Sequence, residues 1–128
     1  MQLTSKQLRV WGKESLTEKM FSVDEIVSAT QGKLVGGKKG HEFSGVCIDS
    51  RMVKPGQLFI AIKGARFDGH DFIPQALEAG ASGAVLSMRS RHLRFQNKVL
   101  IQVEDTLTAL QEIARVHRSR FNIPVIAI

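Results

Sequence analysis

The sequence contains one cysteine, Cys47, and three prolines in 128 residues. A single cysteine excludes an internal disulfide framework. Few prolines in a chain that is 43% hydrophobic argue against wholesale disorder. No apolar run approaches the roughly 18–20 residues needed to cross a bilayer, and the first residues lack the apolar block of a secretory signal peptide. These absences predict one globular domain of ordinary size with a cytoplasmic location.

The chain also lacks the marks of a dedicated nucleic-acid-binding protein, although its formal net charge is +6. Much of the positive excess lies in Lys38-Lys39 and in residues 89–94, two segments of turn-like composition. No Lys/Arg-Gly-Phe-Gly-Phe strand motif, zinc-ligand spacing or long basic helix accompanies them. A scattered solvated surface is the simplest interpretation, and the charge is also compatible with a smaller anion such as a diphosphate. We expect no nucleic-acid partner, and a small basic nucleic-acid-binding domain is the competing hypothesis.

From residue 21 onward, apolar segments alternate with capping and turn signals. Ser22 and Glu25 form a capping box that predicts a helix ending near Gly32. Apolar segments of strand length predict strands over residues 33–35, 43–48, 57–62, 83–87 and 99–103. Strands and helices in this order predict an α/β fold with a small mixed, partly parallel sheet flanked by helices.

Two further helices follow from capping signals in the second half of the chain. Asp71 is the expected N-cap of a helix over residues 72–79, with Pro74 in its first turn, where the missing N–H does little harm. Asp105 is the expected N-cap of a long helix that ends near Phe121. The predicted apolar stripe of that helix comprises Leu107, Leu110, Ile113, Ala114 and His117. We expect His117 to be a core or interface histidine.

Two of the predicted strands end in polar, glycine-containing turns. Residues 43–48 run into Asp49-Ser50-Arg51, and residues 57–62 run into a turn over residues 63–70. Core strands need neither the charges nor the glycines at those ends. The two turns therefore indicate the rim of a binding site for a charged small molecule.

These turns belong to an ordered series of motifs between residues 43 and 87. The series is Asp49-Ser50-Arg51, Pro55-Gly56, Leu58-Phe59-Ile60-Ala61, Lys63-Gly64, Asp68-Gly69-His70, Phe72, Gln75-Ala76 and Gly80-Ala81. It closely resembles the N-terminal, UDP-substrate-binding domain of the Mur ligases, the ATP-dependent amide ligases of peptidoglycan synthesis. One such tripeptide alone is weak evidence, but the ordered series is specific.

Two members of this family share the series: the ligase that adds the third residue of the stem peptide and the ligase that adds D-alanyl-D-alanine. Residues 23–35 and the segment Arg66-Phe67-Asp68-Gly69-His70 resemble the second more closely. The sequence lacks the His-Gln pair that some third-residue ligases carry in the latter segment. The third-residue ligase is the alternative.

The resemblance also implies a domain organisation. In the family, a first domain holds the UDP end of the UDP-muramoyl-peptide, a central domain holds ATP, and a last domain helps to hold the incoming amino acid or dipeptide. We expect a domain over residues 21–122, and the first strand of the central domain at residues 123–128. Residues 1–20 lie outside the resemblance and are compatible with an extension or a small docked helix.

The family's central domain continues into a Gly-Lys-Thr phosphate loop, which does not occur in this sequence. We therefore expect no cofactor in this chain, ATP and magnesium in the full-length enzyme, and no activity of the 128 residues alone. The full-length enzyme is expected to join D-alanyl-D-alanine to UDP-N-acetylmuramoyl-tripeptide. A non-enzymatic paralogue that stops at Ile128 is a further possibility.

The resemblance implies a set of residues that bind uridine diphosphate. Uridine contacts are expected near Ile48 and Ser50, whose hydroxyl can help satisfy the imide edge of uracil. Arg51 and Lys63 can supply cationic donors to the diphosphate. The remaining expected contacts are Gly64, Ala65, Arg66, Phe67 and Asp68, while Asp49, Gly69 and His70 are expected to shape the loops.

Several of these residues have a structural alternative. Arg51 and Lys63 can be solvated surface charges, and Asp49 can bond only its own loop. Phe67 can stack on a base, or it can be a core plug under its loop. His70 can reach a phosphate or bond a backbone carbonyl. Cys47 is expected to be a buried small hydrophobe with no nucleophilic role.

Overall fold

In the computed structural model, residues 20–87 and 97–121 are described. The expectations for residues 1–19, 89–94 and 123–128 lie outside these residues. The first half contains β1 (Phe21–Ser22), α2 (Val23–Thr30), β2 (Lys33–Gly36), β3 (Glu42–Phe43), β4 (Val46–Cys47) and β5 (Leu58–Ile60). The second half contains the 3-10 helix η1 (Gly69–Phe72), α3 (Ile73–Glu78), β6 (Gly83–Ser87), β7 (Val99–Val103) and α4 (Thr106–Phe121).

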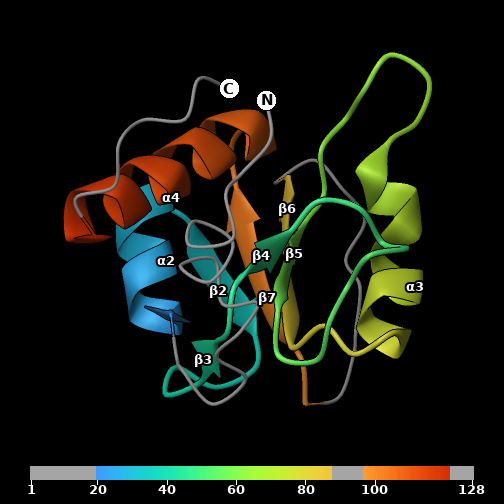
Figure 1. The fold of residues 1–128 in the computed structure, drawn as a ribbon. Helices are drawn as coiled ribbons and strands as arrows, with labels where there is room; N and C mark the ends of the chain where they lie inside the picture. Colours follow the sequence, from blue (N-terminus) through green and yellow to red (C-terminus); the bar gives the residue numbers. More distant parts are fainter. Residues whose placement is uncertain (1–19, 88–96, 122–128) are drawn as a thin grey trace.

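The main sheet has five strands in the order β2-β7-β6-β5-β4. The strands from β4 to β7 run parallel to one another, and β2 pairs antiparallel with β7. Helices α2 and α4 cover one face of this sheet and α3 covers the other (Figure 1). A separate short pair joins β1 and β3. The predicted α/β fold with a mixed sheet flanked by helices is confirmed.

The buried strands send alternate side chains to two apolar cores. In β5, Leu58 and Ile60 belong to the core that also contains residues of α2 and α4. Phe59, between them, belongs to the core that contains the buried side of α3. The same alternation in β7 sends Ile101 to the first core and Leu100 to the second. Strands buried on both faces explain why their sequences are almost uniformly apolar.

The helix starts follow the local signals in two of three cases. The capping box of α2 is present: the Ser22 hydroxyl accepts from the Glu25 N–H at 3.1 Å, and the Glu25 carboxylate accepts from the Ser22 N–H at 2.8 Å. At the start of α4, the Asp105 carboxylate accepts from the Leu107 N–H and from the Thr108 hydroxyl. Both predicted caps are confirmed.

The third predicted cap is wrong. The carboxylate of Asp68, and not that of Asp71, accepts the backbone N–H of His70 at 3.0 Å and caps η1, which leads directly into α3. Pro74 does lie in the first turn of α3, as predicted. The helical segment therefore begins at Gly69, three residues before the predicted start at Phe72. This start lies inside the turn over residues 63–70 that was assigned to the rim of the binding site.

Three smaller expectations also need correction. Residues 43–48 do not form one strand, because Phe43 pairs with β1 whereas Val46 pairs with β5. Helix α2 ends at Thr30, near the predicted position, and its C-cap is Gln31, whose φ of 58° is left-handed, so Gly32 is not the terminating residue. Gly32 instead permits close packing on β7, since a Cβ there would lie 2.9 Å from the Gln102 carbonyl oxygen. Leu107, predicted on the apolar stripe of α4, is 50% exposed.

Two buried residues bear on the predicted start of the domain and on the predicted apolar stripe of α4. Met20 is buried in the first core, although the predicted domain starts at Phe21. His117 is buried, as expected, with its ring 6.0 Å from the ring of Phe21. Burial lowers the pKa of the His117 imidazole.

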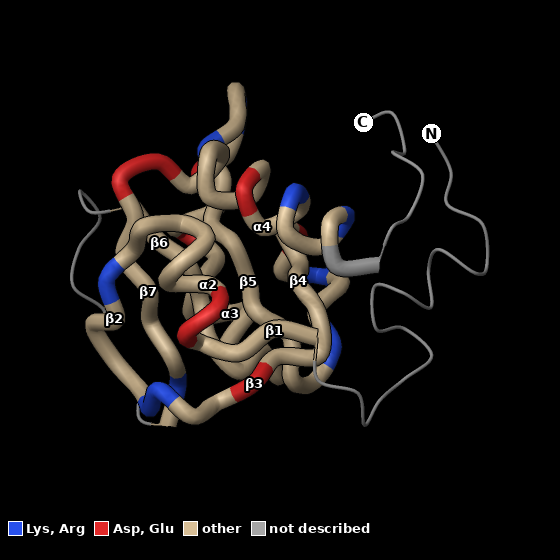
Figure 2. Tube along the Cα trace, turned by 90° about the vertical axis from the view of Figure 1, so that its left-hand side faces the viewer, with Lys and Arg blue, Asp and Glu red and all other residues tan. Residues whose placement is uncertain are grey.

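The charged residues of the described segments are distributed around the molecule. Figure 2 shows Lys and Arg at separate places along the trace, with Asp and Glu between them. This distribution fits the scattered surface charge that the composition suggests. Within residues 20–87 and 97–121, no helix has both the length and the apolar character needed to span a membrane.

Candidate functional site

A pocket of about 510 Å³ lies beside the carboxyl ends of β4 and β5. Its lining comprises Ile48, Asp49, Ser50, Arg51, Phe59, Ile62, Phe67, Gly69, Phe72 and Gln75. Two loops contribute most of these residues: residues 48–51, here called the Asp49 loop, and residues 63–70, here called the Asp68 loop. Open α/β sheets bind ligands at the carboxyl ends of their strands. The pocket therefore lies where this architecture places a functional site.

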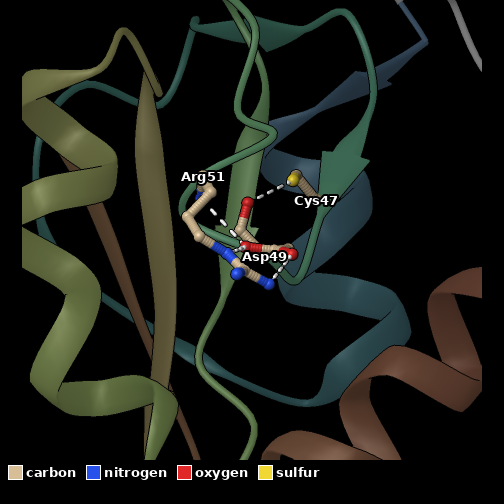
Figure 3. Close-up of polar contacts among 3 residues, drawn as sticks. All are labelled: Cys47, Asp49 and Arg51. Carbon is tan, nitrogen blue, oxygen red and sulfur yellow. Dashed lines mark hydrogen bonds and ion pairs between the residues drawn. The ribbon is translucent and has the colours of Figure 1, made fainter.

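The Asp49 loop is organised by an ion pair within the loop (Figure 3). The carboxylate of Asp49 accepts the Arg51 backbone N–H at 2.9 Å, Nε–H at 3.1 Å and Nη2–H at 3.0 Å. These bonds from Arg51 hold the pKa of the Asp49 carboxyl below its ordinary value. The Arg51 side chain is nevertheless 79% exposed. Asp49 thus braces the loop, and the outer N–H groups of Arg51 face solvent.

Cys47 supports this loop from the end of β4. Its thiol donates to the backbone carbonyl of Asp49 at 3.1 Å (Figure 3). Burial raises the pKa of the Cys47 thiol, which favours its neutral form. The side chain is half-buried, so the expectation of a fully buried cysteine is wrong in degree, while an inert thiol agrees with this environment.

The Asp68 loop folds back on itself and onto the end of β5. The Gly64 N–H donates to the Phe67 carbonyl at 2.7 Å, and the Gly69 N–H donates to the Ile62 carbonyl at 2.8 Å. At Gly69 the two chain segments approach so closely that a Cβ would lie 2.7 Å from the Ile62 nitrogen. Only glycine fits there without displacing backbone. This contact explains the glycine of the Asp68-Gly69-His70 motif.

His70 connects the Asp68 loop to β6. Its Nδ1 lies 2.6 Å from the Asp68 carboxylate, and its Nε2 accepts the Ser87 backbone N–H at 2.9 Å. Because Nε2 accepts, the ring proton lies on Nδ1 and is donated to Asp68. The bonds from His70 lower the pKa of the Asp68 carboxyl, with a smaller contribution from the charge of Lys63. These bonds of His70 connect the Asp68 loop to β6.

Phe67 projects from the Asp68 loop and is 67% exposed. Its ring makes an edge contact with Phe72, with centroids 6.2 Å apart and planes at 67°. Phe72 is partly buried against the second core. The interpretation of Phe67 as a core plug is therefore wrong, and its ring face is available to a flat ligand.

The predicted binding residues divide into two groups. Ile48, Ser50, Arg51 and Phe67 come together in the pocket lining. The others belong to the Asp68 loop but not to the lining: Lys63, Gly64, Ala65 and Arg66, which are exposed, and Asp68. Sequence reasoning named neither the apolar lining of Phe59, Ile62 and Phe72 nor Gln75 as contacts. Gln75 follows Phe72 by one helical turn, and that spacing was the available signal.

No group of three or more His, Cys, Asp or Glu suited to a metal ion occurs in the part of the chain that the structure describes. A Gly-Lys-Thr phosphate loop does not occur in the 128 residues. The donors at the pocket suit a ligand that combines anionic and aromatic groups.

A mixed sheet between two helical layers, with a polar and aromatic pocket at its carboxyl edge, defines an α/β domain with a candidate ligand site. A family model described as "Mur ligase family, catalytic domain" matches residues 42–118. The chain belongs to the Mur ligase family, and the resemblance noted in its motifs is confirmed.

Individual relatives are similar to this chain over part of their length. The UDP-N-acetylmuramoyl-tripeptide–D-alanyl-D-alanine ligase of Treponema pallidum is 39% identical over 111 residues, which cover 80% of this chain and 24% of the relative. The Bacillus subtilis ligase of the same name is 46% identical over 84 residues, which cover 66% of this chain and 18% of the relative. A 2,6-diaminopimelate ligase of Bacteroides thetaiotaomicron is 39% identical over 92 residues, covering 72% and 19%. The chain thus spans a quarter or less of these relatives.

Solved structures give the same picture. A crystal structure of MurF from Acinetobacter baumannii aligns with a TM-score of 0.68 and 28% identity, over 78% of this chain and 21% of that one. MurF from Thermotoga maritima in complex with ADP aligns with a TM-score of 0.52 and 33% identity, over 59% of this chain and 17% of that structure. The fold of this chain is therefore similar to about a fifth of a MurF structure.

Proposed function

We propose that this chain is the substrate-recognition domain of a MurF-type ligase and binds the UDP end of UDP-N-acetylmuramoyl-tripeptide. The observation that carries the proposal is the pocket, which brings Ser50, Arg51 and Phe67 together at the carboxyl edge of the sheet. The names of the most similar relatives support the type of ligase. The proposed domain covers residues 21–122, with residues 123–128 as the start of an ATP-binding domain.

Each part of uridine diphosphate has a proposed partner. The uracil ring stacks on the exposed face of Phe67, and the uridine contacts Ile48 and Ser50. The diphosphate lies near the outer N–H groups of Arg51 and the exposed cations Lys63 and Arg66, with Gly64 and Ala65 offering backbone N–H groups. Asp68 contributes mainly through the geometry of its loop. Because Asp49 already neutralises part of the Arg51 charge, Lys63 and Arg66 carry much of the proposed attraction for the diphosphate.

The domain contributes positioning to the proposed ligase reaction. Binding energy realised at the UDP end, far from the reacting carboxyl group, places the peptide for bond formation. ATP, magnesium and D-alanyl-D-alanine are proposed to bind parts of the full-length ligase that these residues do not supply. The 128-residue chain is accordingly proposed to bind and not to react.

Titration of UDP into the isotopically labelled chain tests the proposal. We expect amide signals of residues 48–51 and 63–70 to shift, and Arg51→Ala to weaken binding severalfold. Arg115→Ala is the matched control, because Arg115 is also an exposed arginine paired with a nearby carboxylate, Glu112, but lies on α4 outside the pocket. Tighter binding of mixed oligonucleotides than of UDP, with shifts at Lys38 and Lys39, would overturn the proposal in favour of nucleic-acid binding.

The third-residue ligase is a second candidate, because diaminopimelate ligases also match this chain at up to 41% identity. UDP binding does not separate the two, since both substrates carry the same UDP end. Assays of the full-length ligase separate the two candidates. D-alanyl-D-alanine consumption with UDP-N-acetylmuramoyl-tripeptide supports the first candidate, and diaminopimelate consumption with the dipeptide substrate supports the second.

A further inference from the structure

We infer that Gln75 is a specificity-determining residue whose side-chain amide hydrogen-bonds the polar edge of the pyrimidine base. This inference rests on the proposed function and concerns the same pocket. Gln75 lies on α3 and lines the pocket together with the Asp49 loop and the Asp68 loop. Gln75 belongs to the motif series, but its place in that series does not by itself indicate a contact with the ligand.

The backbone of Gln75 is held firmly while its side chain is exposed. Its neighbours Ile73, Ala76 and Leu77 are buried in the second core. Its carbonyl accepts the Ala79 N–H at 2.9 Å. The side chain itself is exposed and forms part of the pocket lining. A polar side chain on a fixed backbone, facing a pocket, is a suitable recognition group because little ordering is needed on binding.

The polar lining leaves few groups that can recognise a neutral base edge. Asp49 and Arg51 are charged and bonded to each other, so neither is a neutral partner for the edge of a base. Among the residues of the lining, Ser50 and Gln75 carry the uncharged hydrogen-bonding side chains. Ser50 is 8% exposed, which leaves its hydroxyl a narrow approach. Gln75 therefore offers the most accessible neutral donor and acceptor.

Phe67 and Gln75 line the same pocket, so a base stacked on Phe67 would present its edge toward the remaining lining residues, Gln75 among them. The edge of uracil presents an N–H between two carbonyl oxygens. An amide supplies one acceptor and one donor and can pair with the N–H and one adjacent oxygen at once. A two-bond contact of this type discriminates between bases.

Substitutions at Gln75 give distinct expectations. Gln75→Leu keeps approximate size and removes both hydrogen-bonding groups, so UDP affinity is expected to fall about tenfold. Gln75→Glu offers only acceptors, which suit the exocyclic amino group of cytosine and repel the carbonyl oxygens of uracil. Its affinity for UDP should fall further than its affinity for CDP.

Calorimetric titrations of UDP and CDP against the 128-residue chain and both variants test the inference. The expected result is a shift of the UDP-to-CDP affinity ratio of about tenfold toward CDP in Gln75→Glu, with unchanged thermal unfolding. Gln111→Leu and Gln111→Glu are matched controls, since Gln111 is exposed on α4 away from the pocket. A purely structural role would change both affinities together and leave the ratio unaltered.

The titrations distinguish a failure of the inference about Gln75 from a failure of the proposed function. If the unmodified chain binds UDP and both Gln75 variants bind it equally well, the inference about Gln75 is wrong and the proposed function stands. If the unmodified chain binds neither nucleotide, the proposed function is wrong and the inference falls with it. An unchanged UDP-to-CDP ratio in Gln75→Glu also overturns the inference.

Discussion

The two loops at the pocket use the same local motif with different outer connections. In each, an aspartate accepts both the backbone N–H and the side chain of the basic residue two positions later: Asp49 from Arg51, and Asp68 from His70. The Arg51 side chain is 79% exposed, whereas that of His70 is 15% exposed and also accepts the Ser87 N–H of β6. The same motif thus gives an accessible charge in one loop and a structural connection in the other.

Replacing the two basic residues provides the largest expected difference between the loops. His70→Ala removes the bonds to Asp68 and to the Ser87 N–H, and is expected to lower the free energy of unfolding by about 2 kcal/mol. Arg51→Ala removes bonds that lie in solvent, and no change in the urea midpoint is expected. Urea denaturation at neutral pH measures both. Equal destabilisation by the two substitutions would contradict the distinction drawn between the loops.

Within the Asp68 loop itself, ligand binding should depend on the exposed side chain of Phe67 and not on the fold-stabilising bonds of His70. Phe67→Ala in the Asp68 loop is expected to weaken UDP binding by about 1–3 kcal/mol, because it removes the proposed stacking surface. Since Phe67 is 67% exposed, the melting temperature should stay nearly unchanged. Phe72→Ala is the informative control, because Phe72 packs against the second core and its removal should destabilise the fold. Loss of cooperative melting in Phe67→Ala would show that the Phe67 ring stabilises the fold.

The buried part of the fold was predictable because its signals are local or continuous. Strands β6 and β7 are buried on both faces and therefore form uninterrupted apolar segments in the sequence. The capping box at Ser22 involves residues three apart and needs no tertiary partner. The position of the candidate site was also predictable, because the resemblance to the family implied Ser50, Arg51 and Phe67 as binding residues.

The remaining features depend on partners that are distant in sequence. Asp68 and Asp71 are both suitable caps, and the His70 bond to Ser87, 17 residues away, fixes the loop in which Asp68 takes that role. The predicted strand at residues 43–48 divides because its two halves pair with different strands. The spacing of Gln75 from Phe72 signals only a shared helix face, and the packing of α3 against the sheet is what places that face at the pocket.

The smallest expected difference between the loops is in how much each aspartate contributes to stability at acid pH, and acid titration tests it. The pKa of the Asp68 carboxyl is lowered in the folded state by the bonds from His70. Its contribution to stability is therefore fully present above the unfolded pKa of about 3.9, and it is lost as the pH falls through the lower folded pKa. Asp68→Asn is expected to flatten the decline of stability in this acid range. Urea midpoints measured from about pH 5 downward give the profile.

Asp49→Asn is the matched comparison, because Arg51 lowers the pKa of the Asp49 carboxyl in the same direction. The Asp49–Arg51 pair is exposed, so salt screens it: at about 1 M salt the Debye length is only about 3 Å. The pH profile of Asp49→Asn should then coincide with that of the unmodified chain, while that of Asp68→Asn should remain flatter. If both variants flatten the profile equally in high salt, the Asp49 carboxylate stabilises the fold as much as Asp68 does, and exposure does not separate the two loops.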